Sequence, residues 1–449
     1  MTRRIFCKVL LVVVAIFGVL VLSGVLSAQG NRDWAFEHVK DVQERNIDRF
    51  MAIDGVEGTA IGYNQNDQLA VKVFTAGPGV RGIPQELDGV PVQVVVTGKF
   101  YALPKPGKTP PGQAKKDRPP AAPTGLMATA DIDNAKIDLV WAVNNEPDLS
   151  HYNVYCSGTS GGPYSQIASN VTMNSYTDTY LAPSIYYYVV TAVDLAEHES
   201  DYSNEAWATT DPGTEPPKPL LWCERPVPIG VSTGHPDITA GTIGCRVTDG
   251  TNVYALSNNH VYANSNNADI GDNVLQPGRV DGGVDPDDTI GTLAAFEPIV
   301  FGPRGINTID AAIAEIIIDN VDGVDTPRVG NATPSDGYGT PSSDIFEGDL
   351  LNLEVQKYGR TTGQTYGAVD SINATVKVRY GRGFAIFENQ IVITPGTFSS
   401  GGDSGSLIVT DDLNYNPIGL LFAGSSTMTV ANPIGEVLEA FSVDIDGTP

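Results

Sequence analysis

Two proline-rich stretches divide the chain and limit how its parts can fold. Residues 104–120 ("PKPGKTPPGQAKKDRPP") and 211–222 ("DPGTEPPKPLLW") combine Pro with Lys or Gly, a composition that favours an extended, exposed backbone over a packed core. At 449 residues the chain is also too long for a single hydrophobic core. We therefore predict three folded units, at residues 33–103, 121–210 and 223–449.

The first 28 residues have the layout of a secretory signal peptide. A basic start at Arg3, Arg4 and Lys8 precedes an almost wholly apolar run, and small residues follow at Ser27 and Ala28. This pattern predicts export and a secreted, extracytoplasmic protein that has no membrane attachment after cleavage. The alternative is a retained transmembrane anchor, because the apolar run is near the minimum length for a span.

The charge balance restricts the partners of the chain. It has 27 basic and 53 acidic side chains, for a net charge of −26. A protein this acidic repels phosphate backbones, so we predict no nucleic-acid partner. Nothing in the sequence sets the oligomeric state.

The unit at 33–103 reads as a small α+β module. Residues 33–51 place apolar side chains at helical spacing, and "GTAIGYNQNDQLAVKVFTA" then reads as two strands around an "NQND" turn. We consider two roles for this module, a pro-segment that assists folding or masks a cleft, and a simple structural appendage.

The unit at 121–210 shows strand signals at regular spacing, among them "KIDLVW", "HYNVYCS" and "YYYVVTAVD". Trp141 lies on an early strand, and Tyr186 occupies the tyrosine-corner position of sandwich folds. The unit resembles a fibronectin type III domain. That resemblance implies a β-sandwich and leaves function open, because such domains serve as spacers and as adhesion modules.

The unit at 223–449 alternates short strands with turns rich in Gly, Asn and Asp, which predicts barrels or a sandwich. "FSSGGDSGSLIV" contains Ser404, which is either part of a simple turn or a nucleophile. A nucleophile needs a base and a carboxylate behind it. His260 in "ALSNNHVY" follows an apolar strand, and Asp310 in "NTIDAAIAEI" is embedded among apolar residues, where a buried carboxylate requires a partner.

The order His260, Asp310, Ser404, with gaps of 50 and 94 residues, together with "GGDSGS", "YGRTTGQTYGAV" and "PIGLLFAGSS", resembles the bacterial chymotrypsin/trypsin-like serine proteases. The resemblance implies a double β-barrel, with Ser404 as nucleophile, His260 as general base and Asp310 as its orienting carboxylate. The main-chain N–H groups of Gly402 and Ser404 would form the oxyanion hole. The fold class we predict is mainly β, with this barrel pair at the C-terminus, a central fibronectin type III sandwich and the N-terminal α+β module.

The chain departs from the family pattern at several positions. The resemblance would place Phe398 at the base of the specificity pocket, and because Phe398 supplies no carboxylate there, cleavage after Lys or Arg is not expected. Phe422 replaces a serine of the family's substrate-flanking strand. It has no hydroxyl group that could make the family's usual hydrogen bond near Asp310. In many members a new N-terminus neutralises the residue equivalent to Asp403. Here no clear activation site precedes the domain, so either another cation meets Asp403 or processing occurs in a linker.

Two further expectations concern cysteines and metal ions. Cys223 and Cys245 flank one short segment and are expected to pair, leaving Cys156 as a thiol. The resemblance also suggests a Ca²⁺ loop in the acidic stretch 263–291. Its candidate oxygen ligands are Asp281, Asp285, Asp287 and Asp288. Because this spacing fits no defined motif, a solvated acidic loop is the alternative, and we expect no required cofactor.

These observations predict an exported serine endopeptidase that acts on protein or peptide substrates. Two alternatives stay open. The chain would instead be a secreted protein-binding pseudoprotease, with the sandwich as its interaction module, or an esterase that uses the same residues.

Overall fold

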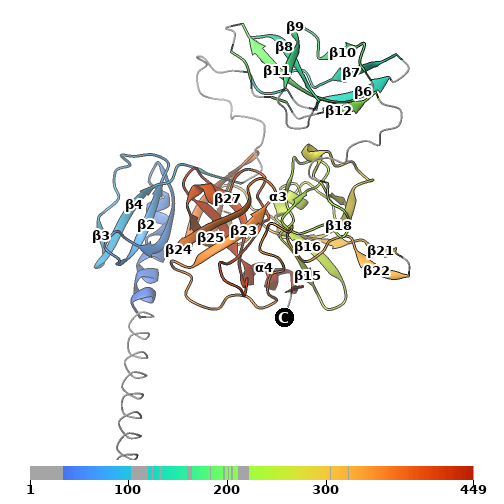
Figure 1. Cartoon of the computed structure of the whole chain (residues 1–449). Helices are drawn as coiled ribbons and strands as arrows, with labels where there is room; N and C mark the ends of the chain where they lie inside the picture. The colour runs from blue at the N-terminus through green and yellow to red at the C-terminus, as the bar shows by residue number, and fades with distance from the viewer. Residues whose placement is uncertain are drawn as a thin grey trace, which may run out of the picture. The chain divides into compact units, whose positions relative to one another are not determined.

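The structure is a computed structural model that describes residues 34–102, 120–210 and 222–447, apart from short gaps in the middle range and residues 304 and 322 (Figure 1). The predicted signal peptide and most of both predicted linkers lie outside the described residues. In the part of the chain that is described, no helix is both long and apolar enough to cross a membrane.

The chain divides into two compact units. Among the described residues, the larger comprises residues 34–102, 223–279 and 283–447, and the smaller comprises residues 120–210 and 222 with 280–282. The segment predicted as a separate module at 33–103 therefore lies in the same compact unit as the C-terminal domain.

A six-stranded antiparallel sheet forms the first barrel of the larger unit. Its strands, in spatial order, are β17 (Asn273–Leu275), β18 (Thr289–Phe296), β20 (Ala312–Ile316), β16 (Val253–Ser257), β15 (Cys245–Thr248) and β29 (Asp444–Ile445). Two hairpins accompany this sheet, one formed by β13 (Ser232–Thr233) and β14 (Gly241–Thr242), the other by β21 (Ile318–Val321) and β22 (Val324–Pro327). The same part of the chain contains the short helix α3 (Asn259–Tyr262) and the turn η1 (Arg279–Asp281).

The second barrel is a closed ring of six strands. In order around the ring they are β23 (Glu354–Gly359), β24 (Gly363–Tyr380), β25 (Gly383–Thr394), β28 (Thr429–Pro433), β27 (Pro417–Gly424) and β26 (Leu407–Thr410), and β26 pairs back to β23. The short strand β19 (Ile306–Asn307) pairs with β25, the turn η2 (Gly396–Phe398) precedes β26, and α4 (Ile434–Phe441) follows β28.

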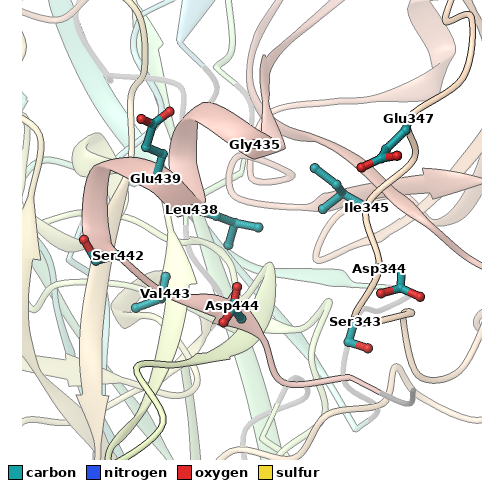
Figure 2. A pocket seen from close by; sticks show the side chains of 10 residues that line it. All are labelled: Ser343, Asp344, Ile345, Glu347, Gly435, Leu438, Glu439, Ser442, Val443 and Asp444. Atoms are coloured by element: carbon teal, nitrogen blue, oxygen red, sulfur yellow. The ribbon is translucent and has the colours of Figure 1, made fainter.

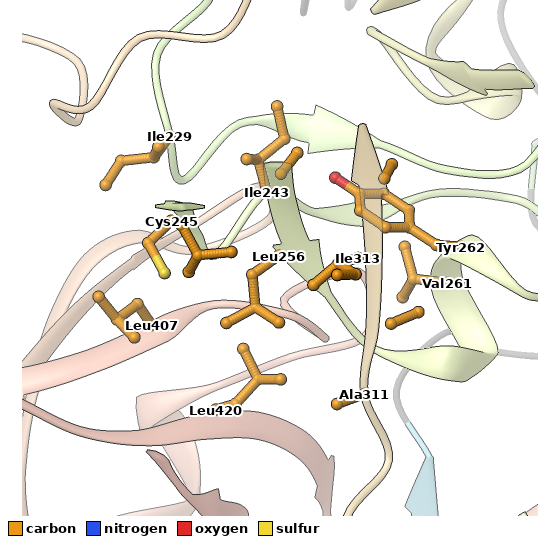
Figure 3. Packing of buried hydrophobic residues seen from close by; sticks show 14 of the residues in the cluster. Ile229, Ile243, Cys245, Leu256, Val261, Tyr262, Ala311, Ile313, Leu407 and Leu420 are labelled. Atoms are coloured by element: carbon orange, nitrogen blue, oxygen red, sulfur yellow. The ribbon is translucent and has the colours of Figure 1, made fainter. Parts of the chain in front are cut away.

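One buried cluster joins the two barrels. Ile243, Leu256 and Ile313 come from the first barrel, while Leu407 and Leu420 come from the second, and all five are at most 5% exposed (Figure 3). Apolar side chains at alternate positions of β15 supply one wall of this cluster, as expected for a strand that has one face in the core.

The N-terminal segment extends the sheet of the second barrel. It consists of a helix at residues 34–44, α2 (Ile47–Met51), β1 (Val56–Tyr63), β2 (Leu69–Thr75), β3 (Glu86–Leu87), β4 (Val90–Val96) and β5 (Phe100–Ala102). Strand β1 pairs with β2 on one side and with β24 on the other, which explains why seven of its eight residues are buried. Strand β5 pairs with both β24 and β27.

The smaller unit is a sandwich of two antiparallel sheets, as its resemblance to a fibronectin type III domain implied. One sheet has the order β10 (Ser175–Thr179), β7 (Lys136–Val140), β6 (Met127–Asp131), and the other has the order β12 (Ala206–Thr209), β11 (Ile185–Asp194), β8 (Leu149–Ser157), β9 (Ser165–Val171). The Tyr186 hydroxyl donates to the carbonyl of Ala182 at 3.0 Å. The predicted tyrosine corner is therefore present.

The core of the sandwich is centred on Trp141, which is 2% exposed and packs edge-on against Tyr152 with ring centroids 5.3 Å apart. We expect Trp141→Ala to lower the free energy of unfolding of this unit by about 3–5 kcal/mol, because it leaves a large cavity. Thermal unfolding followed by calorimetry would measure the loss, and Met173→Ala, at a site 67% exposed, is the control. Equal transitions in both variants would contradict this account of the core.

Candidate active site

His260 lies in the first turn of α3, directly after β16. The polar residues of "SNN" end the strand and hold the turn: the Asn258 side chain donates to the carbonyl of Asp310 at 2.7 Å, and the Asn259 side chain donates to the carbonyl of Glu297 at 2.7 Å. His260 itself is 3% exposed. The imidazole is therefore fixed by a rigid element instead of a loop.

Asp310 lies between β19 and β20 and is fully buried. Its Oδ2 is 2.5 Å from Nδ1 of His260, and its Oδ1 accepts the main-chain N–H of His260 at 3.1 Å. Because a carboxylate only accepts hydrogen bonds, Nδ1 carries the proton, and Nε2 is left as the acceptor. The two-point contact fixes both the tautomer and the orientation of the ring.

Tyr380, at the end of β24, completes the surroundings of this carboxylate. Its hydroxyl donates to Oδ2 of Asp310 at 2.8 Å. Burial, together with the Asp310 charge, raises the pKa of Tyr380 well above its usual value, so the phenol stays protonated and acts as a donor. Phe422 stands at the position where the family that the sequence resembles has a serine. Tyr380 supplies a hydroxyl from another strand, while the Phe422 ring packs against Phe387 with centroids 4.7 Å apart.

Ser404 lies in the tight loop between η2 and β26 and is fully buried. Its Oγ donates to the carbonyl of Phe422 at 3.5 Å. Gly402 has a φ of +100°, and a Cβ there would lie 2.4 Å from Oγ1 of Thr361. Gly402 is thus required for both conformation and space, and the loop that carries Ser404 is held in one shape.

Gly241 and Thr242 lie between the Ser404 loop and the helix that carries His260. The main-chain N–H of Thr242 donates to the carbonyl of Ser404 at 2.7 Å. A Cβ at Gly241 would lie 3.0 Å from that same carbonyl oxygen and 2.5 Å from Cγ2 of Val261, the residue after His260. The structure therefore pairs His260 directly with Asp310, and it brings the Ser404 main chain next to the helix that carries His260.

A second buried ion pair supports the Ser404 loop, and its basic partner is a residue that the sequence alone did not indicate. Nζ of Lys357 lies 3.6 Å from Oδ2 of Asp403, and both side chains are fully buried. Asp403 also accepts the main-chain N–H groups of Thr361 at 2.8 Å and of Ser400 at 2.9 Å. Burial lowers the pKa of Lys357, and the Asp403 charge opposes that shift. Lys357 is thus the cation whose identity the sequence left open.

Phe398 lies in η2 and is 1% exposed. Its ring belongs to a buried cluster with Val369 and Ile393, and Nζ of Lys357 lies 5.8 Å from its centroid. Its part in substrate selection stays a prediction.

The expected bridge between Cys223 and Cys245 is corrected by the structure, in which both are thiols. Cys245 faces the core of the first barrel from β15 and is fully buried, while Cys223 is only partly buried. Burial raises the pKa of both thiols, and that of Cys156 to about 11, so none is held as a reactive thiolate.

The acidic loop uses several carboxylates as local hydrogen-bond acceptors. Asp285 accepts from the Asn273 side chain at 2.5 Å, and Asp288 accepts from the main-chain N–H of Val284 at 2.8 Å. Among the residues the structure describes, no three His, Cys, Asp or Glu side chains cluster as metal ligands would. A hollow beside α4, lined by Asp344, Glu347 and Glu439 among others, contains none of His260, Asp310 and Ser404 (Figure 2).

Comparison with known proteins gives partial similarities. No family model matches the chain. An amylopullulanase of Thermoanaerobacter thermohydrosulfuricus is 47% identical over 76 residues, which is 17% of this chain and 5% of that protein. The chain therefore matches about a twentieth of the length of that relative.

Two solved structures are similar to separate parts of the chain. An Fn3-like protein from Clostridium thermocellum is 42% identical and is covered completely by 22% of this chain, with a TM-score of 0.19. Thermobifida fusca protease A is 19% identical, with a TM-score of 0.35. The match includes 49% of this chain and 97% of the protease structure.

The predicted fold class is confirmed. The chain is mainly β, with a double β-barrel of the trypsin-like kind at its C-terminal end, a central fibronectin type III sandwich, and an N-terminal segment of helices and strands.

The Lys357–Asp403 pair leads to a stability prediction. Lys357→Met leaves a buried carboxylate without its cation, so we expect a loss of about 3–5 kcal/mol in the free energy of unfolding. Adding Asp403→Asn should recover part of that loss. Urea unfolding would measure both, with Lys40→Met as the control because the Lys40–Glu44 pair, at 3.9 Å, is exposed. A loss below about 1 kcal/mol would contradict the assigned pairing.

Tyr380→Phe removes one donor from the Asp310 carboxylate and leaves the ring in place. A hydrogen bond to a buried charge is worth about 1.5–3 kcal/mol, and we expect a loss of that size in urea unfolding. Tyr366→Phe is the matched control, because Tyr366 is on the same strand and 59% exposed. Equal stability of the two variants would show that the Tyr380 hydroxyl does not support Asp310.

Proposed function

We propose that the chain is an exported serine endopeptidase, with Ser404 as nucleophile, His260 as general base and then general acid, and Asp310 as the residue that orients His260. The observation that carries the proposal is the double contact of Asp310 with His260, at 2.5 Å to Nδ1 and 3.1 Å to the main-chain N–H. A buried carboxylate that accepts the hydrogen bond from Nδ1 of an imidazole leaves the other ring nitrogen, Nε2, able to accept a proton.

In the proposed reaction, Ser404 Oγ attacks the carbonyl carbon of the scissile peptide bond while its proton passes to Nε2 of His260. The negative charge that develops on the carbonyl oxygen is stabilised by the main-chain N–H groups of Gly402 and Ser404, and donors of this kind are worth about 10²–10³ in rate each. His260 then protonates the leaving amine. A water molecule, deprotonated by His260, releases the acyl group from Ser404.

The Ser404 loop favours this role because it is fixed before any substrate binds. Positive φ at Gly402, the hydrogen bonds to Asp403 and the buried Lys357 all hold its backbone in one conformation. Preorganised donors stabilise a transition state without reorganisation during the reaction. With Lys357 as the cation at Asp403, this loop is organised without a new N-terminus.

We infer protein or peptide substrates, with no preference for Lys or Arg, because Phe398 supplies no carboxylate. Export, which the sequence of residues 1–28 predicts, would bring the enzyme to extracytoplasmic substrates. The competing function is protein binding without turnover, through the sandwich unit.

The test is labelling of the purified chain with a fluorophosphonate probe, together with hydrolysis of labelled casein. We expect labelling that Ser404→Ala and His260→Ala abolish, and an activity that Asp310→Asn lowers about 10⁴-fold because the imidazole takes the wrong tautomer. Ser335→Ala, at an exposed serine, is the control. Labelling without casein turnover, but with hydrolysis of a small ester, would favour an esterase. The absence of both labelling and turnover in every form would favour the binding protein.

A further inference from the structure

Two consecutive glycines precede Asp403 and Ser404, and the peptide group between them carries one of the two proposed oxyanion donors. The main-chain N–H of Gly402 belongs to the same peptide group as the carbonyl of Gly401. Because glycine has no Cβ, a peptide group between two glycines meets less steric resistance to rotation than one between larger residues. A donor on such a group keeps one direction only when another part of the chain holds the group.

The hydroxyl of Thr361 holds this peptide group. Its Oγ1 donates to the carbonyl of Gly401 at 2.7 Å. The Gly401–Gly402 bond is trans, and in a trans peptide group the C=O and the N–H point in opposite directions. The hydrogen bond therefore turns the Gly402 N–H away from Thr361. Reversal of the group would break this bond and bring the Gly401 oxygen to the side where the donor now lies.

The side chain of Arg360 makes the Thr361 hydroxyl a donor toward Gly401. Nη1 of Arg360 donates to Thr361 Oγ1 at 3.1 Å. A hydroxyl has a single proton, and while its oxygen accepts from the guanidinium, that proton is directed to the Gly401 carbonyl. A reversed peptide group would present its own N–H to an oxygen that already accepts from a charged donor. The Arg360–Thr361 pair thus favours one orientation of the group over the other.

The Gly402 N–H has the surroundings of a donor that is kept for a ligand. Gly402 is buried, and within the described part of the chain its N–H makes no hydrogen bond. Buried main-chain N–H groups without a partner are rare in folded proteins. This N–H lies two residues before Ser404, where the developing oxyanion of the proposed reaction requires a donor.

The second proposed donor, the N–H of Ser404, is held in a different way. It shares a peptide group with the carbonyl of Asp403, which accepts from Ser406 Oγ at 2.7 Å and from the Ser406 main-chain N–H at 3.0 Å. Ser406 is fully buried, so these contacts belong to the interior of the barrel. Thr361 is exposed, and the hydrogen bond that it makes with Gly401 comes from a side chain alone.

We infer that Thr361 is a positioning residue for the proposed hydrolysis, and that its hydroxyl aims the Gly402 N–H at the oxyanion by holding the carbonyl of Gly401. The inference rests on the proposed function and deepens it. Thr361 acts through the Gly401–Gly402 peptide group and does not itself touch the substrate. Arg360 contributes by directing the proton of that hydroxyl.

The test is a pair of variants of the full chain that differ by one oxygen atom. Thr361→Ser keeps Oγ and Thr361→Ala removes it, and both retain the main-chain N–H that donates to Asp403 at 2.8 Å. With a p-nitrophenyl ester as substrate, we expect Thr361→Ala to lower kcat about tenfold and to change KM by less than about twofold, because a misdirected donor weakens transition-state binding alone. Thr361→Ser should keep a kcat within about twofold of the wild type.

Two further readouts separate positioning from a general loosening of the site. Fluorophosphonate labelling of Ser404 also places an oxygen in the oxyanion hole, so its rate should fall in Thr361→Ala by about the same factor. The acid limb of the pH–rate profile should not move, because Thr361 acts on the Gly402 N–H and not on the imidazole of His260. Thr251→Val, at an exposed hairpin position, is the control, and equal thermal unfolding midpoints would show that all variants are folded.

The outcomes distinguish this inference from the proposed function. Equal kcat values and labelling rates in the wild type, Thr361→Ala and Thr361→Ser would overturn the role of Thr361 and leave the hydrolase intact. An equal loss in both variants would also overturn it, because the missing methyl group and not the hydroxyl would then be responsible. A shifted acid limb in Thr361→Ala would do the same, since it would place the effect at His260. No labelling and no hydrolysis in any form would overturn the hydrolase, and the inference with it.

Discussion

The carboxylate of Asp310 is the group on which the arrangement of the C-terminal domain depends. A charge that is removed from water must be compensated by partners, and here the partners come from distant parts of the chain. His260 approaches from the first barrel, and Tyr380 approaches from the end of β24 in the second. Asn432 of β28 accepts the main-chain N–H of Asp310 at 3.0 Å. Both barrels must therefore pack correctly before this one side chain is satisfied, which couples the integrity of the fold to the geometry of the candidate site.

The second buried carboxylate, Asp403, is compensated by different chemistry. It faces a lysine and a row of main-chain N–H groups instead of an imidazole and a phenol. The two environments give the acids separate roles. Asp310 orients a ring that can exchange a proton, whereas Asp403 fixes the backbone on which Ser404 sits. Since Lys357 comes from β23 of the same barrel, this support forms when the barrel forms.

The features that the sequence predicted are those whose signal is local. The strand of "ALSNNHVY", the aspartate embedded in "IDAAIA" and the glycines of "GGDSGS" each show their pattern within a few residues. The hydroxyl of Tyr380 instead meets a carboxylate 70 residues away, and Lys357 meets Asp403, which is 46 residues away in sequence. A short window of sequence gives no signal for a contact between residues this far apart. Each residue, taken alone, has the pattern of an ordinary strand or turn position. The expected Cys223–Cys245 bridge was wrong for a related reason, since closeness in sequence did not show that Cys245 faces the barrel core.

The N-terminal segment shows most clearly that a sequence pattern does not reveal contacts between distant parts of the chain. Its sequence predicts a helix and strands, and these are present, but a period-2 pattern does not say which strand lies next to which. Only the pairing of β1 with β24, and of β5 with β24 and β27, makes the segment part of the second barrel's sheet. A segment that shares a ladder, an aromatic cluster and buried ion pairs with its host is held by many contacts at once.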